Sequence, residues 1–224
     1  MKYSAIITDI EGTTSRISFV SEVLFPYAAA HLPDFVRQHA NQPEVAAELA
    51  ACRELMRQPQ ADTEQIIQQL LNWIATDTKA TPLKALQGMV WQQGYQHGDF
   101  KGHLYQDAYQ QLLRWHQQGI RLYVYSSGSV QAQQLLFKYS DFGDLTPIFS
   151  GYFDTRTGAK REMSAYASIL QTLQLPPRQV LFLSDVVAEL DAAKPLGIDT
   201  VQLIREGQTA GSHRTASDFF QVLE

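Results

Sequence analysis

Side chains that could do chemistry stand at the ends of three short apolar runs in this sequence. They are three carboxylates and two hydroxyls: Asp9, Glu11, Asp185, Ser126 and Ser127. If the runs are parallel strands, their carboxyl ends meet at one edge of a sheet, where open α/β sheets bind ligands. Carboxylate oxygens at such an edge favour a hard divalent cation. The pattern therefore predicts a polar site that could hold a metal ion.

The segment Asp9–Thr14 is the most specific local signal. An aspartate at a strand end can attack phosphorus and form an aspartyl-phosphate. Glu11 would face the same way as Asp9 if the strand continued, and it could protonate a leaving oxygen and then activate water. Gly12 would let the backbone turn tightly out of the sheet. A strand-to-turn exit with solvated carboxylates would use the same residues, so this segment alone leaves both interpretations open.

The apolar runs are short and rich in β-branched or aromatic residues, as buried parallel strands are. Four of them are present: Ala5–Ile7, Leu122–Tyr125, Val180–Leu183 and Thr200–Ile204. Between the runs, apolar residues recur at helical spacing, as in residues 108–115, and Gly119 is placed to end that helix. Strands that alternate with helices predict βαβ units and a parallel sheet.

Residues 21–95 differ from the rest of the chain, because they show four helical stretches and no clear strand. One stretch starts at Asp62–Glu64, and another starts at Thr81–Pro82, where a proline favours the first helical position. An insert of this length is too long for a simple connection. We therefore predict two domains, an α/β core of residues 1–18 and 97–224 and a helical domain of residues 19–96.

The composition narrows the class of protein. The chain has 224 residues and a net charge of −5, so it can bury a large core and lacks the basic balance of a nucleic-acid binder. Cys52 is the only cysteine, which excludes a disulfide within the chain, and its apolar neighbours predict burial.

Scattered glutamines are interpreted as neutral helix surface. No apolar run is long enough to span a membrane and no signal-peptide pattern is present, so we expect a cytoplasmic protein.

Four segments together resemble the motifs of the haloacid dehalogenase (HAD) superfamily, in the same order. Asp9–Thr14 is similar to motif I, Ser126–Ser129 to motif II, Lys160 to motif III and Ser184–Glu189 to motif IV. The helical insert after motif I resembles the C1 cap of this superfamily. The resemblance implies a HAD-like α/β fold, with a doubly wound parallel sheet core and an all-helical C1-type cap inserted after the first strand.

Glu11 stands where most HAD phosphatases have aspartate, and this variant points to the enolase-phosphatase E1 family of methionine salvage. Four segments are similar to that family: Asp9–Ala28, Lys101–His103, Ser126–Val130 and Phe153–Lys160. The resemblance implies a bifunctional Mg²⁺-dependent hydrolase, an acireductone synthase. Such an enzyme enolises 2,3-diketo-5-methylthiopentyl 1-phosphate and then hydrolyses the phosphate through an aspartyl-phosphate, which yields acireductone and inorganic phosphate.

The resemblance also implies a role for each motif residue. Asp9 would be the nucleophile and a metal ligand, while Glu11 would be the acid/base and a ligand through its backbone carbonyl. Asp185 would be the third protein ligand of one Mg²⁺ per subunit. Lys160 would be a catalytic lysine that binds the phosphate, because an ammonium can neutralise a phosphoryl oxygen and its repulsion with Asp9.

Ser126 and Ser127 would bind the phosphate or another substrate oxygen, together with N–H groups of the turn that follows them. The partner implied is a small-molecule phosphate substrate. We expect no nucleic-acid partner and no membrane, and the family resemblance suggests a monomer.

Three further residues have two possible interpretations each. Glu189 either contacts Lys160 or a metal-bound water, or merely suits the first turn of a helix. Most of the histidines are interpreted as surface residues. His103 is the exception, because it could also have a role in substrate binding. Phe19 either belongs to the core of the helical domain or lines a pocket for the methylthio tail. Besides Glu11, no base for the enolisation step is identified.

Other functions are possible on the same motifs. The first is another Mg²⁺-dependent HAD phosphatase that acts on a small phosphate ester of the phosphoglycolate type, which Glu11 and its flanking segment disfavour. The second is a non-catalytic phosphate sensor, which we would expect to lack at least one of Asp9, Glu11, Lys160 and Asp185. A HAD dehalogenase would not need Asp185 for Mg²⁺, so metal dependence distinguishes it.

Overall fold

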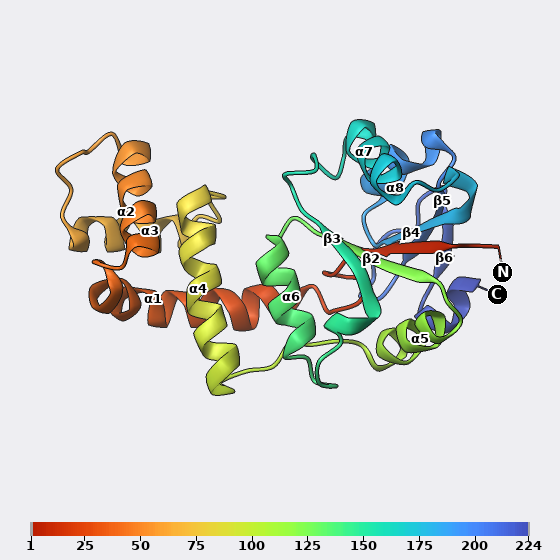
Figure 1. Ribbon diagram of the computed structural model, residues 1–224, viewed down its shortest axis with the longest axis horizontal. Helices are drawn as coiled ribbons and strands as arrows, with labels where there is room; N and C mark the ends of the chain where they lie inside the picture. Colours follow the sequence, from red (N-terminus) through yellow and green to blue (C-terminus); the bar gives the residue numbers. More distant parts are fainter. Residues whose placement is uncertain (1, 224) are drawn as a thin grey trace. The chain divides into compact units, whose positions relative to one another are not determined.

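The computed structural model describes residues 2–223. This part of the chain divides into two compact units, a helical unit of Val20–Phe100 and an α/β unit formed by the residues before and after it (Figure 1). The predicted range of the helical domain is 19–96. The helical unit extends to residue 100 because α4 (Thr81–His97) continues past residue 96, and Phe100 packs edge-on against Tyr27 and Tyr95.

A parallel sheet of six strands forms the centre of the α/β unit, in the order β3-β2-β1-β4-β5-β6. The strands are β1 (Ala5–Thr8), β2 (Arg121–Tyr125), β3 (Phe149–Phe153), β4 (Val180–Ser184), β5 (Asp199–Leu203) and β6 (Arg214–Ala216). The first strand lies between β2 and β4, so later strands are added on both sides of it. The predicted doubly wound parallel sheet is confirmed. The four predicted runs are β1, β2, β4 and β5, whereas β3 and β6 were not predicted.

Helices cover both faces of this sheet. On one face, α7 (Met163–Leu173) and α8 (Val187–Ala193) pack against Ala5 and Ile7 of β1. On the other face lies α5 (Gln106–Gln117), while α6 (Val130–Lys138) follows β2 and contacts β3 (Figure 1). Short 3₁₀ turns complete the unit: η2 (Thr146–Ile148), η3 (Pro177–Gln179), η4 (Lys194–Leu196) and η5 (Phe219–Leu223). The sheet is therefore buried between two helical layers, as a parallel sheet requires.

The helical unit has its own apolar core. Its elements are a π-helix, η1 (Val20–Leu24), followed by α1 (Phe25–His39), α2 (Pro43–Met56), α3 (Thr63–Ala75) and α4. The start of α3 matches the prediction, because Asp62 caps it and exchanges two hydrogen bonds with Gln65. Leu70 and Cys52 are fully buried in the core, so the predicted burial of the cysteine is confirmed.

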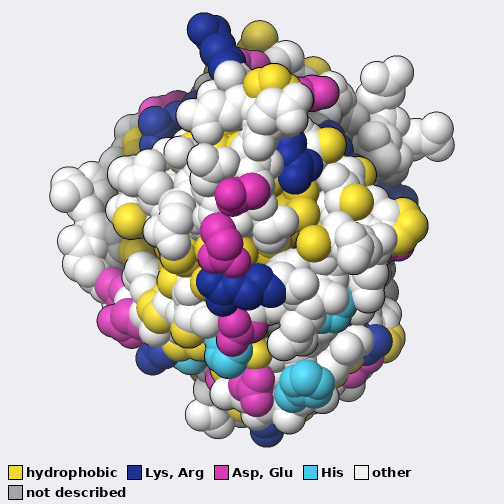
Figure 2. Space-filling view, turned by 90° about the vertical axis from the view of Figure 1, so that its left-hand side faces the viewer, with side chains coloured by type: hydrophobic (Ala, Val, Ile, Leu, Met, Phe, Trp, Pro, Cys, Tyr) yellow, Lys and Arg dark blue, Asp and Glu magenta, His cyan; other side chains and the backbone are white. Residues whose placement is uncertain are grey.

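On the face of the molecule drawn in Figure 2, acidic and basic side chains are interspersed among apolar and neutral ones. Within the helical unit, Arg37 forms ion pairs with Asp34 and Glu64. No helix in the described part of the chain combines the length and the apolar character that crossing a bilayer requires.

Candidate active site

Three strands that are neighbours in the sheet end beside the predicted site residues. Asp9 is the first residue after β1, Ser126 the first after β2, and Asp185 the first after β4. Backbone hydrogen bonds extend the sheet by one residue at two of these positions: the Asp9 N–H donates to Leu183 O at 2.9 Å, and the Ser126 N–H donates to Phe153 O at 3.2 Å. The sheet thus places all three residues at one carboxyl edge.

Asp9 is buried, and its two shortest polar contacts are made by one oxygen, while Ser184 Oγ lies 3.5 Å from the other oxygen, Oδ2. Its Oδ1 accepts a hydrogen bond from the Ile10 N–H at 2.7 Å and lies 2.7 Å from the Lys160 ammonium nitrogen. Two donors at Oδ1 therefore fix the plane of the carboxylate. One of them is the charged Lys160 ammonium, and a charged donor makes a hydrogen bond shorter and stronger.

Lys160 bridges two carboxylates. Its Nζ lies 2.7 Å from Asp9 Oδ1 and 2.7 Å from Glu189 Oε2, and only 6% of its side chain is exposed. Burial by itself lowers the pKa of the Lys160 ammonium, but the charges of Asp9 and Glu189 outweigh burial and raise the pKa above its usual value. The ammonium is therefore charged and fixed at the centre of the site.

The loop that carries Lys160 is attached to the body of the α/β unit by two tyrosines. Tyr125 donates to Gly158 O at 2.9 Å, and Tyr166 donates to Lys160 O at 2.7 Å. Gly158 has a φ of +146°, and a Cβ there would come within 2.7 Å of Ala165. These contacts explain how a residue in a loop, far from the other motifs in sequence, reaches the sheet edge.

Glu189 contacts Lys160, which decides between the two interpretations of the sequence. It lies in the first turn of α8, and its Oε2 also accepts a hydrogen bond from Ser184 Oγ at 2.9 Å. Burial and then the charge of Asp9 raise the pKa of the Glu189 carboxyl, while Lys160 opposes the shift. Glu189 therefore acts as the second anchor of the ammonium.

Asp185 lies beside the glycine of motif I. Gly12 has a φ of +69°, and a Cβ at this position would lie 2.3 Å from Asp185 Oδ2, so the backbone approaches the carboxylate more closely than any other residue type allows. Burial and then the charge of Asp9 raise the pKa of Asp185 to about 6. Two carboxylates are thus close enough to repel each other at this edge.

The turn after β1 corrects one part of the sequence argument. The strand ends at Thr8, and Ile10 O accepts the N–H groups of Thr13, Thr14 and Ser15, so the backbone turns at once. Glu11 is exposed whereas Asp9 is buried. The strand alternation that would make the two carboxylates face the same way does not extend to this segment.

The loop of motif II has one buried and one exposed serine. Ser126 is buried and its Oγ accepts the Gly128 N–H at 3.1 Å, while Ser127 is exposed. Two residues outside the predicted set hold this loop: Gln133 donates to Gly128 O and Phe153 O, both at 2.8 Å, and Asp154 accepts the Val130 N–H at 3.2 Å. The sequence offered no spacing signal for Gln133, and Asp154 stood out only within a segment of family resemblance.

His103 lies among the residues that connect the two units in sequence. Its Nδ1 accepts the Arg16 N–H at 3.2 Å and is 3.3 Å from Ser15 Oγ, and its ring lies 6.4 Å from that of the buried Phe19. Burial and then the charge of Arg16 lower the pKa of His103. The structure therefore places Phe19 against His103 within the α/β unit, and His103 holds the segment that follows motif I.

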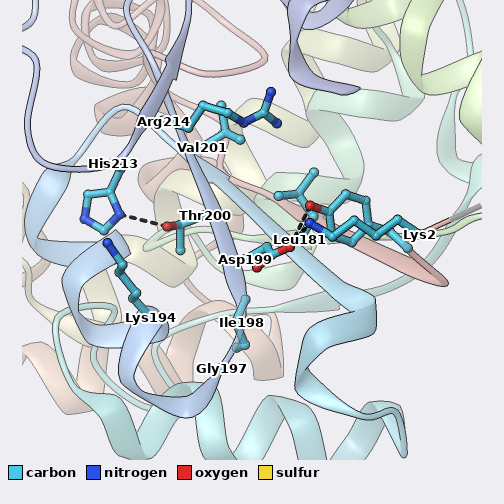
Figure 3. A pocket seen from close by; sticks show the side chains of 11 residues that line it. Lys2, Leu181, Lys194, Gly197, Ile198, Asp199, Thr200, Val201, His213 and Arg214 are labelled. Atoms are coloured by element: carbon cyan, nitrogen blue, oxygen red, sulfur yellow. Dashed lines mark hydrogen bonds and ion pairs between the residues drawn. The ribbon is translucent and has the colours of Figure 1, made fainter. Parts of the chain in front are cut away.

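A hollow of about 350 Å³ lies elsewhere in the α/β unit, at the amino ends of β1 and β5 (Figure 3). It is lined by an ion pair of Lys2 with Asp199 and by His213, which contacts Thr200 and Asp191. None of the predicted site residues lines this hollow. The carboxyl edge, rather than this hollow, is the candidate active site.

Comparison with known proteins identifies the family. A model of the haloacid dehalogenase-like hydrolases matches residues 3–197. An enolase-phosphatase E1 from Pseudomonas fluorescens is 58% identical over 98% of this chain and 96% of its own length. The chain belongs to the enolase-phosphatase E1 family. A further enolase-phosphatase E1, from Azotobacter vinelandii, is 56% identical over 99% of this chain and 98% of its own length.

Solved structures agree with this family on the fold. The UTR4 protein of Saccharomyces cerevisiae is 36% identical, with a TM-score of 0.84 over 98% of this chain and all of that chain. The predicted family, fold class and phosphatase activity are therefore confirmed. HAD hydrolases and enolase-phosphatases generally depend on Mg²⁺. In this enolase-phosphatase, the four motifs converge on the sheet edge that carries Asp9, Lys160 and Asp185.

We predict that Gly12→Ala abolishes most of the activity of this enolase-phosphatase. The left-handed backbone costs an alanine about 1–2 kcal/mol of stability, and its Cβ would also displace the Asp185 carboxylate. A displacement of about 1 Å can cost on the order of 10²-fold in rate. Phosphate release and thermal unfolding measure the two effects separately.

Gly119→Ala is the matched control, because Gly119 has a φ of +82° and a Cβ added there would have nothing within 4 Å. This variant should lose similar stability and keep its activity. Equal activity of the two variants would contradict a role for the close approach of Gly12 to Asp185.

Proposed function

We propose that this chain enolises 2,3-diketo-5-methylthiopentyl 1-phosphate and then hydrolyses its phosphate to give acireductone in methionine salvage. One observation carries the phosphatase half of this proposal: a buried aspartate at a strand end lies 2.7 Å from a buried lysine ammonium. The family membership supports the enolase half, because the relatives are named for both activities.

In the proposed chemistry, Asp9 is the nucleophile. Ile10 and Lys160 hold Oδ1 at 2.7 Å each, whereas the contact of Ser184 Oγ with Oδ2 is longer, at 3.5 Å, so Oδ2 is the proposed attacking atom. The Asp9 Oδ2–P bond forms while the bond from phosphorus to the substrate oxygen breaks, and Glu11 gives that oxygen a proton. Water then attacks the aspartyl-phosphate, Glu11 takes the proton from this water, and phosphate leaves with Asp9 restored.

Lys160 has an electrostatic role in both steps. A dianionic phosphate and an aspartate repel each other, and the Lys160 ammonium lies at the aspartate where this repulsion is greatest. Glu189 also holds the ammonium, at 2.7 Å, so Lys160 is fixed beside Asp9 before the substrate binds. Ser126 and Ser127, which follow β2 at the same edge, are the proposed hydroxyl donors to the phosphoryl oxygens.

The donor set fits one Mg²⁺ per subunit. Asp9, Asp185 and the backbone carbonyl of Glu11 would supply hard oxygen ligands. Burial and then the charge of Asp9 raise the pKa of Asp185, and a divalent cation would relieve the repulsion between the two carboxylates. Mg²⁺ usually takes only one or two carboxylates together with water and substrate oxygens, so two aspartates suffice for the proposed site. When bound, the ion would neutralise charge that develops on the phosphoryl oxygens.

We assign substrate choice to the helical unit, as the C1-type cap of this enzyme. Its support is the compact apolar core of Val20–Phe100, inserted directly after motif I. We also propose that the enzyme is a cytoplasmic monomer whose partner is this small phosphate substrate, without nucleic acid or membrane. The net charge of −5 supports the exclusion of nucleic acid.

Ultraviolet absorbance of the purified protein with the diketo phosphate tests this function, with phosphate release measured in parallel. With Mg²⁺ we expect two resolved phases, enolisation and then phosphate release. Removal of metal by EDTA should stop turnover, and added Mg²⁺ should restore it. Phosphate release without an enolisation phase would indicate another HAD phosphatase, and turnover after complete metal removal would contradict the Mg²⁺ site.

Asp9→Asn should stop phosphate release, because an amide does not attack phosphorus. We expect a loss of about 10⁴–10⁶-fold, as for other covalent nucleophiles. Asp191→Asn makes the same change at an exposed carboxylate on α8 and should leave the rate unchanged. Phosphate release by Asp9→Asn near the wild-type rate, with the amide confirmed by mass spectrometry, would remove Asp9 from this role.

Glu11→Asp should be slow, although aspartate is the usual HAD residue at this position. The carboxyl is withdrawn by one methylene, about 1.5 Å, and such a displacement can cost on the order of 10²-fold in rate. Single-turnover rates separate the two steps: slowed dephosphorylation alone confines Glu11 to the phosphoryl step, and slowing of both steps indicates a shared acid/base. Glu54→Asp, at an exposed position of α2, is the control. Wild-type rates for both steps in Glu11→Asp would show that the glutamate has no special role.

A further inference from the structure

Two glutamines that the proposed function does not use reach Asp185, one from β5 and one from the segment after it. The first is Gln202, which is fully buried at the end of that strand. Its Nε2 donates to Asp185 O at 3.2 Å and to Thr209 O at 2.9 Å, and its Oε1 accepts the Gly211 N–H at 2.8 Å. Gln202 therefore ties the backbone of Asp185 to the loop between β5 and β6.

The second glutamine, Gln208, reaches the carboxylate itself. Its Oε1 accepts the backbone N–H groups of Arg205 at 2.9 Å and of Glu206 at 2.8 Å, and its Nε2 donates to Asp185 Oδ2 at 3.3 Å. An amide has one acceptor atom, so the two backbone donors determine which end of the side chain faces them. The NH₂ group is therefore directed at Asp185 by contacts that do not involve Asp185.

The loop that carries Gln208 is itself fixed to the motif I segment. The guanidinium of Arg205 contacts Asp107 at 2.6 Å and donates to Thr13 O at 3.3 Å, with only 6% of the side chain exposed. Glu206 accepts hydrogen bonds from the Ile17 N–H and the Tyr105 hydroxyl. Arg205 and Glu206 thus link the loop to both segments that connect the α/β unit to the helical unit in sequence.

We infer that Gln208 is a positioning residue, which holds the Asp185 carboxylate in the orientation that binds Mg²⁺. The inference rests on the metal site of the proposed function and extends it to a residue without a role there. A neutral amide suits this task, because it donates a hydrogen bond to one carboxylate oxygen without neutralising the charge that attracts the cation. A lysine or arginine at this place would compete with the metal ion.

The test is Mg²⁺ binding to metal-free protein without substrate, measured by displacement of Mn²⁺ followed by electron paramagnetic resonance. Gln208→Met keeps the length of the side chain and removes its hydrogen bonds. We expect its Mg²⁺ dissociation constant to rise about 10–100-fold, the usual cost when a residue that orients a metal ligand is lost. The rate at saturating Mg²⁺ should recover most of the wild-type value. Gln208→Asn withdraws the amide by one methylene and should change the affinity in the same direction, which serves if the methionine variant does not fold.

Two control variants separate positioning from general loosening. Gln221→Met removes a glutamine that accepts the Ser217 N–H in another loop, and Glu206→Ala loosens the Gln208 loop without removing the bond to Asp185. Gln221→Met should bind Mg²⁺ within about twofold of wild type, and Glu206→Ala should lose less Mg²⁺ affinity than Gln208→Met. An equal loss of affinity in Glu206→Ala and Gln208→Met, or unchanged affinity in the Gln208 variants, would overturn the role of Gln208. Absence of Mg²⁺ binding in the wild type would instead overturn the metal site itself.

Discussion

The buried ammonium of Lys160 is the interaction on which the arrangement of the site depends. Three carboxylates, Asp9, Asp185 and Glu189, gather at one edge of the sheet, and two of them are within 2.7 Å of this single cation. Without it, two buried carboxylates would be left unpaired, a situation that costs several kcal/mol or forces them to bind protons. If all four groups are charged, the cluster keeps an excess of two negative charges, which matches one divalent cation. The proposed Mg²⁺ would neutralise this excess of negative charge.

The loops around this cluster have one feature in common. Each is held by hydrogen bonds with residues that lie outside the four motifs. Gln133 and Asp154 hold the loop of motif II, Tyr125 and Tyr166 hold the loop of Lys160, and Gln202 holds Asp185. Most of these bonds join a side chain to a backbone group, so each determines where a loop lies as well as what it contacts. Phosphoryl transfer depends mainly on positioning and charge. The body of the α/β unit supplies the positioning, and the motif residues supply the charge.

The sequence predicted the parts of the structure that repeat a strong local pattern. Four buried strands, the capped start of α3 and the order of the motifs were all predicted. The two strands that were missed lie at the edges of the sheet: β3 contains Gly151 and is only partly buried, and β6 has three residues. An edge strand has a neighbouring strand on one side only, so less of it is buried. The continuous apolar run that marks a central strand is therefore absent. The glutamines were interpreted as helix surface, but Gln133 and Gln202 are buried, because a side chain that satisfies loop backbone groups has no periodic signature.

The different exposure of Asp9 and Glu11 completes this picture of the site. Asp9 is buried, and Ile10 and Lys160 hold its Oδ1, which suits the proposed attack of Oδ2 on phosphorus. Glu11 is exposed, because the chain turns directly after β1. In the proposed mechanism, Glu11 first gives a proton to the leaving oxygen and then takes one from water, and an exposed side chain is accessible to both. The early turn after Thr8, which the positive φ of Gly12 allows, thus buries one carboxylate and exposes the other.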